Sequence, residues 1–237
     1  HRGSALMTRL LILVEGQSEE VFAKRTLAPH LAAFGVYASV TVLRTKRIMS
    51  GGAFRGGVTS YAKIRQNLLE LLGDRNARVT TLLDFYGLPE DFPGRAAVLA
   101  TPGLTAHDKA IRLQQAFADD IDQARFMPFL ALHEFEAWLF SRPEAVAEHF
   151  GNPALAAALS AIVQQAGTPE EINNDPATHP SARIERLIPS FKKTSDGPTI
   201  LHKTTLTTVR TACPHFGEWL TTLEGLGEPT ENLSAVA

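Results

Sequence analysis

The chain of 237 residues has little of three things that would narrow its class at once: cysteine, long apolar runs and net charge. Its single cysteine, Cys213, excludes an internal disulfide and a cysteine-based zinc site, and it fits a reducing compartment, so we predict a cytoplasmic protein. No apolar run approaches the roughly 18 residues that cross a bilayer, so we expect no contact with a membrane. The formal net charge of -2 gives no overall attraction to nucleic acid, and any such binding would depend on local basic patches.

What the chain does have is enough apolar residues, 44%, for one large domain with a modest appendage. Residues 1–6, HRGSAL, precede an internal Met7 and resemble the remnant of an expression tag, so we exclude them from the fold. We predict an α/β domain over residues 7–150 and a helical C-terminal extension, packed on that domain, over residues 151–237. The sequence leaves the oligomeric state open.

Apolar runs and amphipathic stretches alternate along the first half of the chain. The run Leu10–Val14 is typical of a strand buried on both faces, and Gly16 frees the backbone for a turn before the next helix. Strand, helix, strand, helix, strand in this order predicts a mostly parallel, Rossmann-like sheet with right-handed crossovers and flanking helices. The remaining elements are predicted as a helix at 21–34, a strand at 37–43, a helix at 61–72 and a strand at 79–83.

The second half of the chain is predicted to add one strand and several helices. The apolar run Phe126–Leu132 contains Pro128, which favours an edge strand or a bulge. Beyond residue 150 the composition indicates helices, and a basic loop, Phe191–Pro198, lies between two of them. Helices are expected at 106–121, 154–166 and 181–188, and at 200–226 in two parts that are broken at Pro214.

Acidic residues stand at the end of each predicted strand. Glu15 follows the first strand, Asp84 follows the strand at 79–83, and Glu134 and Glu136 follow the strand at 126–132. Carboxyl ends of parallel strands meet at one edge of a sheet, which is where ligands bind in such folds. Glu19 lies one helical turn beyond Glu15 and is expected to face the same point.

Carboxylates packed this closely repel one another, so their grouping is costly unless a cation neutralises it. Hard divalent cations prefer carboxylate oxygens, and the residues therefore predict a Mg²⁺ or Mn²⁺ site. The predicted metal ligands are Glu15, Glu19, Asp84, Glu134 and Glu136, and Glu15 and Asp84 are the predicted catalytic residues. The alternative for Glu15, Glu19 and the adjacent Glu20 is that they only favour the positive end of a helix dipole.

Basic residues gather in two segments that could contact phosphate. The glycine-rich segment Arg44–Gly57 contains Arg47 and Arg55 but lacks the lysine and hydroxyl order of a nucleotide P-loop. Phosphate-contacting residues are predicted to be Arg47, Arg55, Arg183, Lys192 and Lys193. For each of them the alternative is an ordinary solvated charge, and for the glycine-rich segment it is a plain connector.

Two motifs also carry a resemblance to a known family. A strand that ends in Glu15 and Gly16, followed by a later strand that ends in Asp84, resembles the Toprim domain of topoisomerases, primases and OLD-type nucleases. The segments VEGQSEE, DFYGLPEDFPG and HEFEAWLFS are more closely similar to the DUF4276 family, a set of prokaryotic proteins regarded as Toprim-like. This second resemblance covers Met7 to about Leu226.

The resemblance implies a function for individual positions. Glu15 matches the Toprim glutamate, a metal ligand or general acid/base, and Glu19 matches the second acid of an ExxxE pattern in OLD-like enzymes. Asp84 matches the first aspartate of the Toprim DxD motif. The second aspartate is absent because Tyr86 stands there, and Glu134 or Glu136 could replace it.

Three functions are compatible with these residues. The first is a Mg²⁺-dependent, nuclease-like hydrolase that cleaves phosphodiester bonds in nucleic acid, in prokaryotic defence or DNA maintenance. The second is a module that keeps a Toprim-like scaffold and binds nucleic acid or protein without turnover, which the missing aspartate favours. The third is an enzyme of phosphotransfer or phosphate hydrolysis on small molecules.

Overall fold

The computed structural model describes residues 7–44, 60–172 and 177–227. The predicted phosphate-contacting residues Arg47 and Arg55 lie outside this part of the chain, as does most of the glycine-rich segment around them. Among the described helices, none is both long enough and apolar enough to span a membrane.

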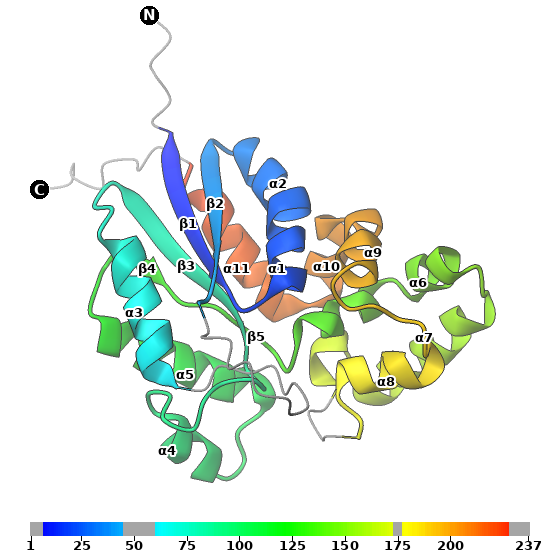
Figure 1. Ribbon diagram of the computed structural model, residues 1–237. Helices are drawn as coiled ribbons and strands as arrows, with labels where there is room; N and C mark the ends of the chain where they lie inside the picture. Colours follow the sequence, from blue (N-terminus) through cyan, green and yellow to red (C-terminus); the bar gives the residue numbers. More distant parts are fainter. Residues whose placement is uncertain (1–6, 45–59, 173–176, 228–237) are drawn as a thin grey trace, which may run out of the picture.

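A parallel sheet forms the centre of the molecule (Figure 1). Its strands lie in the order β2-β1-β3-β4. The short strand β5 also pairs with β3, nearer the carboxyl end of β3 than β4 does. Every pairing is parallel, and Val14 at the end of β1 lies beside Leu82 of β3. The predicted α/β fold class is therefore confirmed. The strands are β1 (Thr8–Val14), β2 (Val36–Val42), β3 (Ala77–Asp84), β4 (Phe126–Met127) and β5 (Leu130–Ala131).

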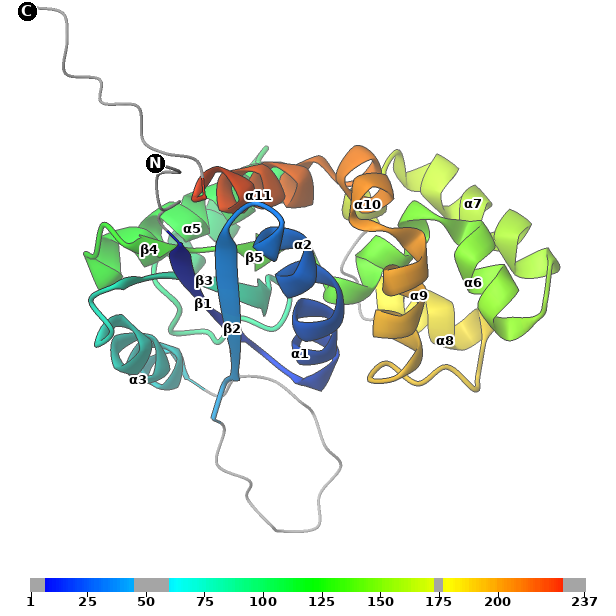
Figure 2. The ribbon, with the colours of Figure 1, turned by 90° about the horizontal axis from the view of Figure 1, so that it is seen from above.

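Alternating side chains of β1 pack on the two faces of the sheet. Leu10, Ile12 and Val14 are buried in one core cluster, and Leu13 is buried in the other. The first cluster includes residues of α1 (Gln17–Phe22), of the π-helix that follows it (Ala23–Leu27), of α2 (Ala28–Ala32) and of α11 (Pro214–Gly225). The second includes residues of α3 (Tyr61–Leu72), α4 (Arg95–Ala100) and α5 (Ala106–Ile121). Figure 2 shows α3 and the α1–α2 pair on opposite sides of the strands.

Pro128 interrupts the edge strand as the sequence predicts. It separates β4 from β5. The backbone on either side of Pro128 forms hydrogen bonds with hydroxyl groups of the neighbouring strand β3. Thr80 donates a hydrogen bond to the carbonyl of Met127, and Thr81 accepts one from the amide of Phe129. These bonds replace part of the ladder that a proline cannot make.

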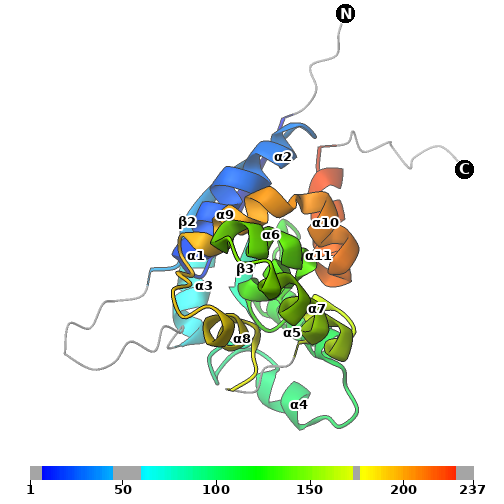
Figure 3. The same ribbon diagram turned by 90° about the vertical axis from the view of Figure 1, so that its right-hand side faces the viewer.

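The second half of the chain is helical and packs beside the sheet, and Figure 3 shows α6 to α9 in front of the strands. Its helices share one core cluster with β1, so apolar contacts run without a break from the sheet into this region. The division of the chain at residue 150 stays a prediction. The elements are α6 (Pro143–Phe150), α7 (Ala154–Ala166), α8 (Pro180–Leu187), α9 (Asp196–Thr204) and α10 (Leu206–Ala212), with short 3-10 helices at Phe135–Ser141 and Pro169–Glu171.

Two details of the helical prediction are wrong. The stretch predicted as a helix in two parts after residue 200 is three helices, because Thr205 has a left-handed backbone (φ 72°) and separates α9 from α10. The basic loop predicted to end at Pro198 ends earlier, since α9 begins at Asp196. A proline in the first turn of a helix loses no hydrogen bond, so its presence there did not mark a loop.

Candidate metal centre

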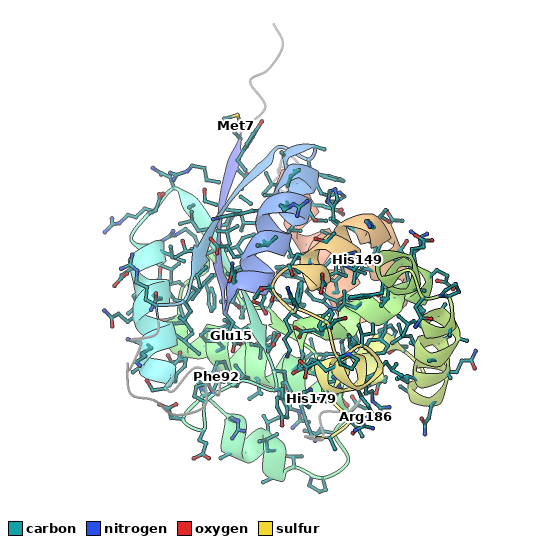
Figure 4. The ribbon with its side chains drawn as sticks, turned by 45° about the vertical axis from the view of Figure 1, so that its right-hand side comes forward. Met7, Glu15, Phe92, His149, His179 and Arg186 are labelled. Carbon is teal, nitrogen blue, oxygen red and sulfur yellow. The ribbon has the colours of Figure 1, made fainter. Side chains whose placement is uncertain are left out.

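Glu15 and Asp84 lie side by side at the carboxyl edge of the sheet. Glu15 follows the last residue of β1, and Asp84 ends the neighbouring strand β3. The amide of Asp84 donates a hydrogen bond to Glu15 Oε2, with a nitrogen–oxygen distance of 3.2 Å. Figure 4 shows Glu15 at the end of β1 opposite Met7. A Cβ atom on Gly87 would stand 3.0 Å from Glu15 Oε1, so a larger residue there would displace the carboxylate by a few tenths of an ångström.

Glu19 and Glu20, adjacent in the first turn of α1, have different surroundings. Glu19 is 8% exposed and its Oε2 accepts a hydrogen bond from the amide of Gly16 over 3.1 Å. Glu20 forms an ion pair with Lys24, in which Glu20 Oε1 lies 2.6 Å from Lys24 Nζ. Glu19 does support the start of its helix, since its carboxylate accepts a hydrogen bond from the amide of the N-cap residue Gly16. A contact with the helix start does not by itself explain why Glu19 is buried near Glu15.

A sharp turn after β5 brings the third acidic segment to the same edge. His133 has a left-handed backbone (φ 62°), and its carbonyl accepts a hydrogen bond from the amide of Tyr86. The amide of Phe135 then donates to Asp84 Oδ1 over 2.9 Å. These two contacts fix the segment that contains Glu134 and Glu136 against the end of β3.

Glu134 is held by the beginning of α8. Its Oε2 accepts hydrogen bonds from the amide of Ser181 (2.9 Å) and from His179 Nδ1 (3.0 Å), and its Oε1 accepts one from the hydroxyl of Ser181 (3.2 Å). The ring of His179 also stacks on Tyr86, with centroids 5.6 Å apart. Glu134 therefore joins the sheet edge to α8, and Tyr86, which stands where the second aspartate is expected, covers the same histidine.

Of the predicted phosphate-contacting residues that the structure describes, Lys193 is the one that contacts the acidic residues. Its Nζ lies 3.8 Å from Glu136 Oε1 and 4.0 Å from Glu134 Oε1. Lys192 is exposed. Arg183 donates a hydrogen bond to the carbonyl of Thr178 and lines a surface pocket with residues of α7, so no described contact joins it to the acids.

The acids affect one another's protonation. Burial, with the charges of Glu15, Glu19, Glu136 and Glu134, raises the pKa of Asp84 well above its ordinary value. Burial also raises the pKa of Glu15, with the hydrogen bond from Asp84 acting against it. The pKa of Glu19 rises to about 7 through burial and the charge of Glu15, and that of Glu136 rises to about 7 through burial, although Lys193 lowers it. These groups therefore share one buried, electrostatically connected site.

This donor set fits a hard divalent cation. All the groups are carboxylates, and Glu136 is 4% exposed with Lys193 as its one described ion-pair partner. Among the described residues, no three of these carboxylates bring oxygen atoms within 4.8 Å of one another. The predicted set of five metal ligands is therefore not brought together at one point, although Mg²⁺ keeps several waters and needs only one or two protein carboxylates.

The roles of His179, Ser181 and Gly87 were not predicted from the sequence. His179 and Ser181 are far from Glu134 in the chain, and no local pattern connects them. The segment His179–Ser181 does have the composition of a helix start, with a proline at the first position, which was the only available signal.

Comparison with known proteins gives one family and one group of similar structures. The family model described as "Domain of unknown function (DUF4276)" matches residues 14–224. Three solved structures of the C-terminal region of the Xanthomonas campestris pv. campestris OLD protein, phased with platinum, mercury and iodine, are 17–18% identical to this chain. The alignments cover 91–92% of this chain and 95–98% of the others, with TM-scores of 0.35–0.36. No curated protein matches.

Proposed function

This chain belongs to the DUF4276 family, described as a domain of unknown function, and we propose that it is a Mg²⁺- or Mn²⁺-dependent enzyme that cleaves phosphodiester bonds in nucleic acid. The observation that carries the proposal is the buried cluster of carboxylates at the carboxyl edge of the sheet, whose pKa values are raised by burial and by one another. Such a cluster is destabilising in the absence of a cation, and its position is the usual ligand site of a parallel sheet.

Glu15, Asp84 and Glu136 are the residues that we propose as metal ligands, of which at most two bind the ion directly and the rest reach it through water, with Glu19 assisting from α1. A bound divalent cation would supply an activated water and stabilise the charge that develops on a phosphate during displacement. The hydrogen bonds from Asp84 to Glu15 and from Phe135 to Asp84 hold these carboxylates in place without consuming all of their oxygen atoms. The backbone thus orients the acids before a ligand arrives.

Glu134 is proposed as a positioning residue, because hydrogen bonds from His179 and Ser181 already engage both of its oxygen atoms. Lys193 is proposed to contact the substrate phosphate. Its ammonium group stands beside Glu136 and its side chain is 40% exposed, so it can meet both the buried acids and a ligand from solvent. A cation in that place balances the negative charge that a phosphate brings to the acids.

A second function is favoured by one observation. Tyr86 occupies the place of the expected second aspartate, and its stacking on His179 leaves an aromatic surface there that is 40% exposed. Aromatic rings bind bases by stacking, so this surface suits a module that binds single-stranded nucleic acid without cleaving it. The two functions differ in turnover, which an assay can measure directly.

Cleavage of supercoiled plasmid and of single-stranded DNA and RNA, with Mg²⁺, Mn²⁺ or EDTA, tests the proposal. We expect cleavage with the metals, none with EDTA, and a loss of at least about 100-fold in rate for Glu15→Gln and Asp84→Asn. Both substitutions keep the size of the side chain. Glu20→Gln is the matched control, because Glu20 lies next to Glu19 on α1 but pairs with Lys24 outside the cluster.

Binding of the same nucleic acids should persist in Asp84→Asn. Robust cleavage by this variant would overturn the assignment of the site. Metal-independent binding without cleavage by the parent protein would favour the second function.

A further inference from the structure

A second group of potential metal ligands lies away from the acidic cluster, where α5 meets α11. His107 is in the first turn of α5, and His215 and Glu218 are in the first turns of α11. One ligand atom from each of the three residues lies within 4.8 Å of the others. Among the described residues, no other group of three His, Cys, Asp or Glu side chains brings its ligand atoms this close together.

The environment of His215 prepares it for a cation. It is 2% exposed, and its ring stacks on Phe129 with centroids 5.0 Å apart. Nε2 lies 3.0 Å from the carbonyl oxygen of Leu130, and a carbonyl can only accept, so Nε2 carries the proton. Nδ1 then has the lone pair, and it is buried without a hydrogen-bond partner among the described residues. A buried nitrogen normally bonds to another group, and this lone pair is available to a metal ion.

The other two residues leave the group open to solvent. The side chain of His107 is 41% exposed and that of Glu218 is 66% exposed, and His107 Nε2 lies 3.8 Å from Glu218 Oε2. The rings of His107 and His215 meet edge to face, with centroids 5.2 Å apart. One ligand atom from each of two imidazoles and one carboxylate therefore lies within reach of a single ion, at a place that two exposed side chains leave open to solvent.

We propose that His107, His215 and Glu218 bind a transition-metal cation of the Zn²⁺ class. Two histidines and one glutamate form a known zinc ligand set, and the fourth position would be taken by water. The hydrogen bond from His215 Nε2 to the backbone of Leu130 is the kind of outer contact that fixes the ring of a metal-binding histidine. Mg²⁺ prefers oxygen ligands, so the two sites differ in the ion that they select.

Such an ion would join two distant parts of the chain. His107 belongs to α5, which packs in the second core cluster, and His215 and Glu218 belong to α11, the last described helix. The metal would therefore stabilise the packing of α11 on the α/β core. This function does not depend on the proposed nuclease activity.

Thermal unfolding with and without ZnCl₂ at neutral pH tests the site. At a Zn²⁺ concentration of roughly a hundred times Kd, we expect the Tm of the parent to rise by about 5–10 °C. His107→Ala and Glu218→Ala should each lose this rise and keep the metal-free Tm within about 2 °C of the parent, because both side chains are on the surface. His215 is in the core, so we leave it unchanged.

His202→Ala is the matched control, because His202 is an exposed histidine on α9 whose Nδ1 lies 3.1 Å from the hydroxyl of Thr26. It should retain the full Zn²⁺ response. The Glu15→Gln protein should also retain it, since the acidic cluster is a separate site. The proposal is overturned if Zn²⁺ leaves the parent Tm unchanged, if either His107→Ala or Glu218→Ala keeps the rise, or if Glu15→Gln abolishes it.

Discussion

Replacing Glu19 by glutamine should stabilise the metal-free protein at pH 8 and change its stability little at pH 5. Burial raises the pKa of Glu19 from 4.5 to about 7, and the nearby charge of Glu15 adds to the effect. Glutamine removes the charge but keeps an oxygen that can accept the hydrogen bond from Gly16. The substitution therefore separates the electrostatic cost of Glu19 from its contact with the start of α1.

The sign of the pH dependence follows from proton binding. The folded protein holds the Glu19 proton up to about pH 7, whereas the unfolded chain releases it near 4.5. Between these values the folded state binds more protons, so the stability that this group contributes at low pH is lost as the pH rises. This difference in pKa between the folded and unfolded states lowers the free energy of unfolding at pH 8 by about 3 kcal/mol. For a chain of this length, that corresponds to roughly 6–12 °C in Tm.

Circular dichroism during heating in EDTA, at pH 5 and pH 8, measures the effect. Glu20→Gln is the control, because Glu20 sits one position further along α1 in an ion pair with Lys24 and should change stability by less than about 0.5 kcal/mol. In millimolar Mg²⁺ the parent should gain more at pH 8 than at pH 5, since metal competes with protons for the carboxylates. An equal Tm change for Glu19→Gln at both pH values would refute the reasoning.

Lys193→Ala should tighten Mg²⁺ binding by about two- to fivefold, because it removes the ammonium group 3.8 Å from Glu136, and it should abolish cleavage by removing the phosphate contact. Calorimetric titration with Mg²⁺ and a plasmid assay measure the two effects, and weaker Mg²⁺ binding would contradict the proposal. Glu134→Ala should act in the opposite direction to Glu19→Gln and lower the Tm by roughly 6–12 °C, since losing the buried partner of Ser181 and His179 costs about 3 kcal/mol. An unchanged Tm would show that α8 does not depend on this carboxylate.

The elements predicted best from the sequence are those whose signals are local. The amphipathic stretches at 61–72 and 106–121 are helices with these same bounds, because apolar spacing and the residues at each end specify a helix without help from the rest of the chain. The strands at β1 and β3 were predicted to within two residues. The helix α4 (Arg95–Ala100) was missed, since six residues carry too little periodicity to be recognised.

The acidic residues of the candidate site were predictable for a related reason. In a parallel sheet, a carboxylate directly after a strand must lie at the carboxyl edge, so the positions of Glu15 and Asp84 followed from strand order alone. Their partners did not. Lys193 reaches Glu136 only because α8 and α9 pack beside the sheet, and the hydrogen bonds from His179 and Ser181 to Glu134 depend on the same packing.

The sequence by itself determined the parallel α/β fold and the edge at which the acids gather, because apolar periodicity and strand order are properties of neighbouring residues. Only the tertiary structure decided how these acids differ: which carboxylate helix α8 engages, which lysine stands beside Glu136, and how deeply Glu19 is buried. It also decided that His107 meets His215 and Glu218. Burial and long-range contact depend on how distant segments pack, and no local pattern records them.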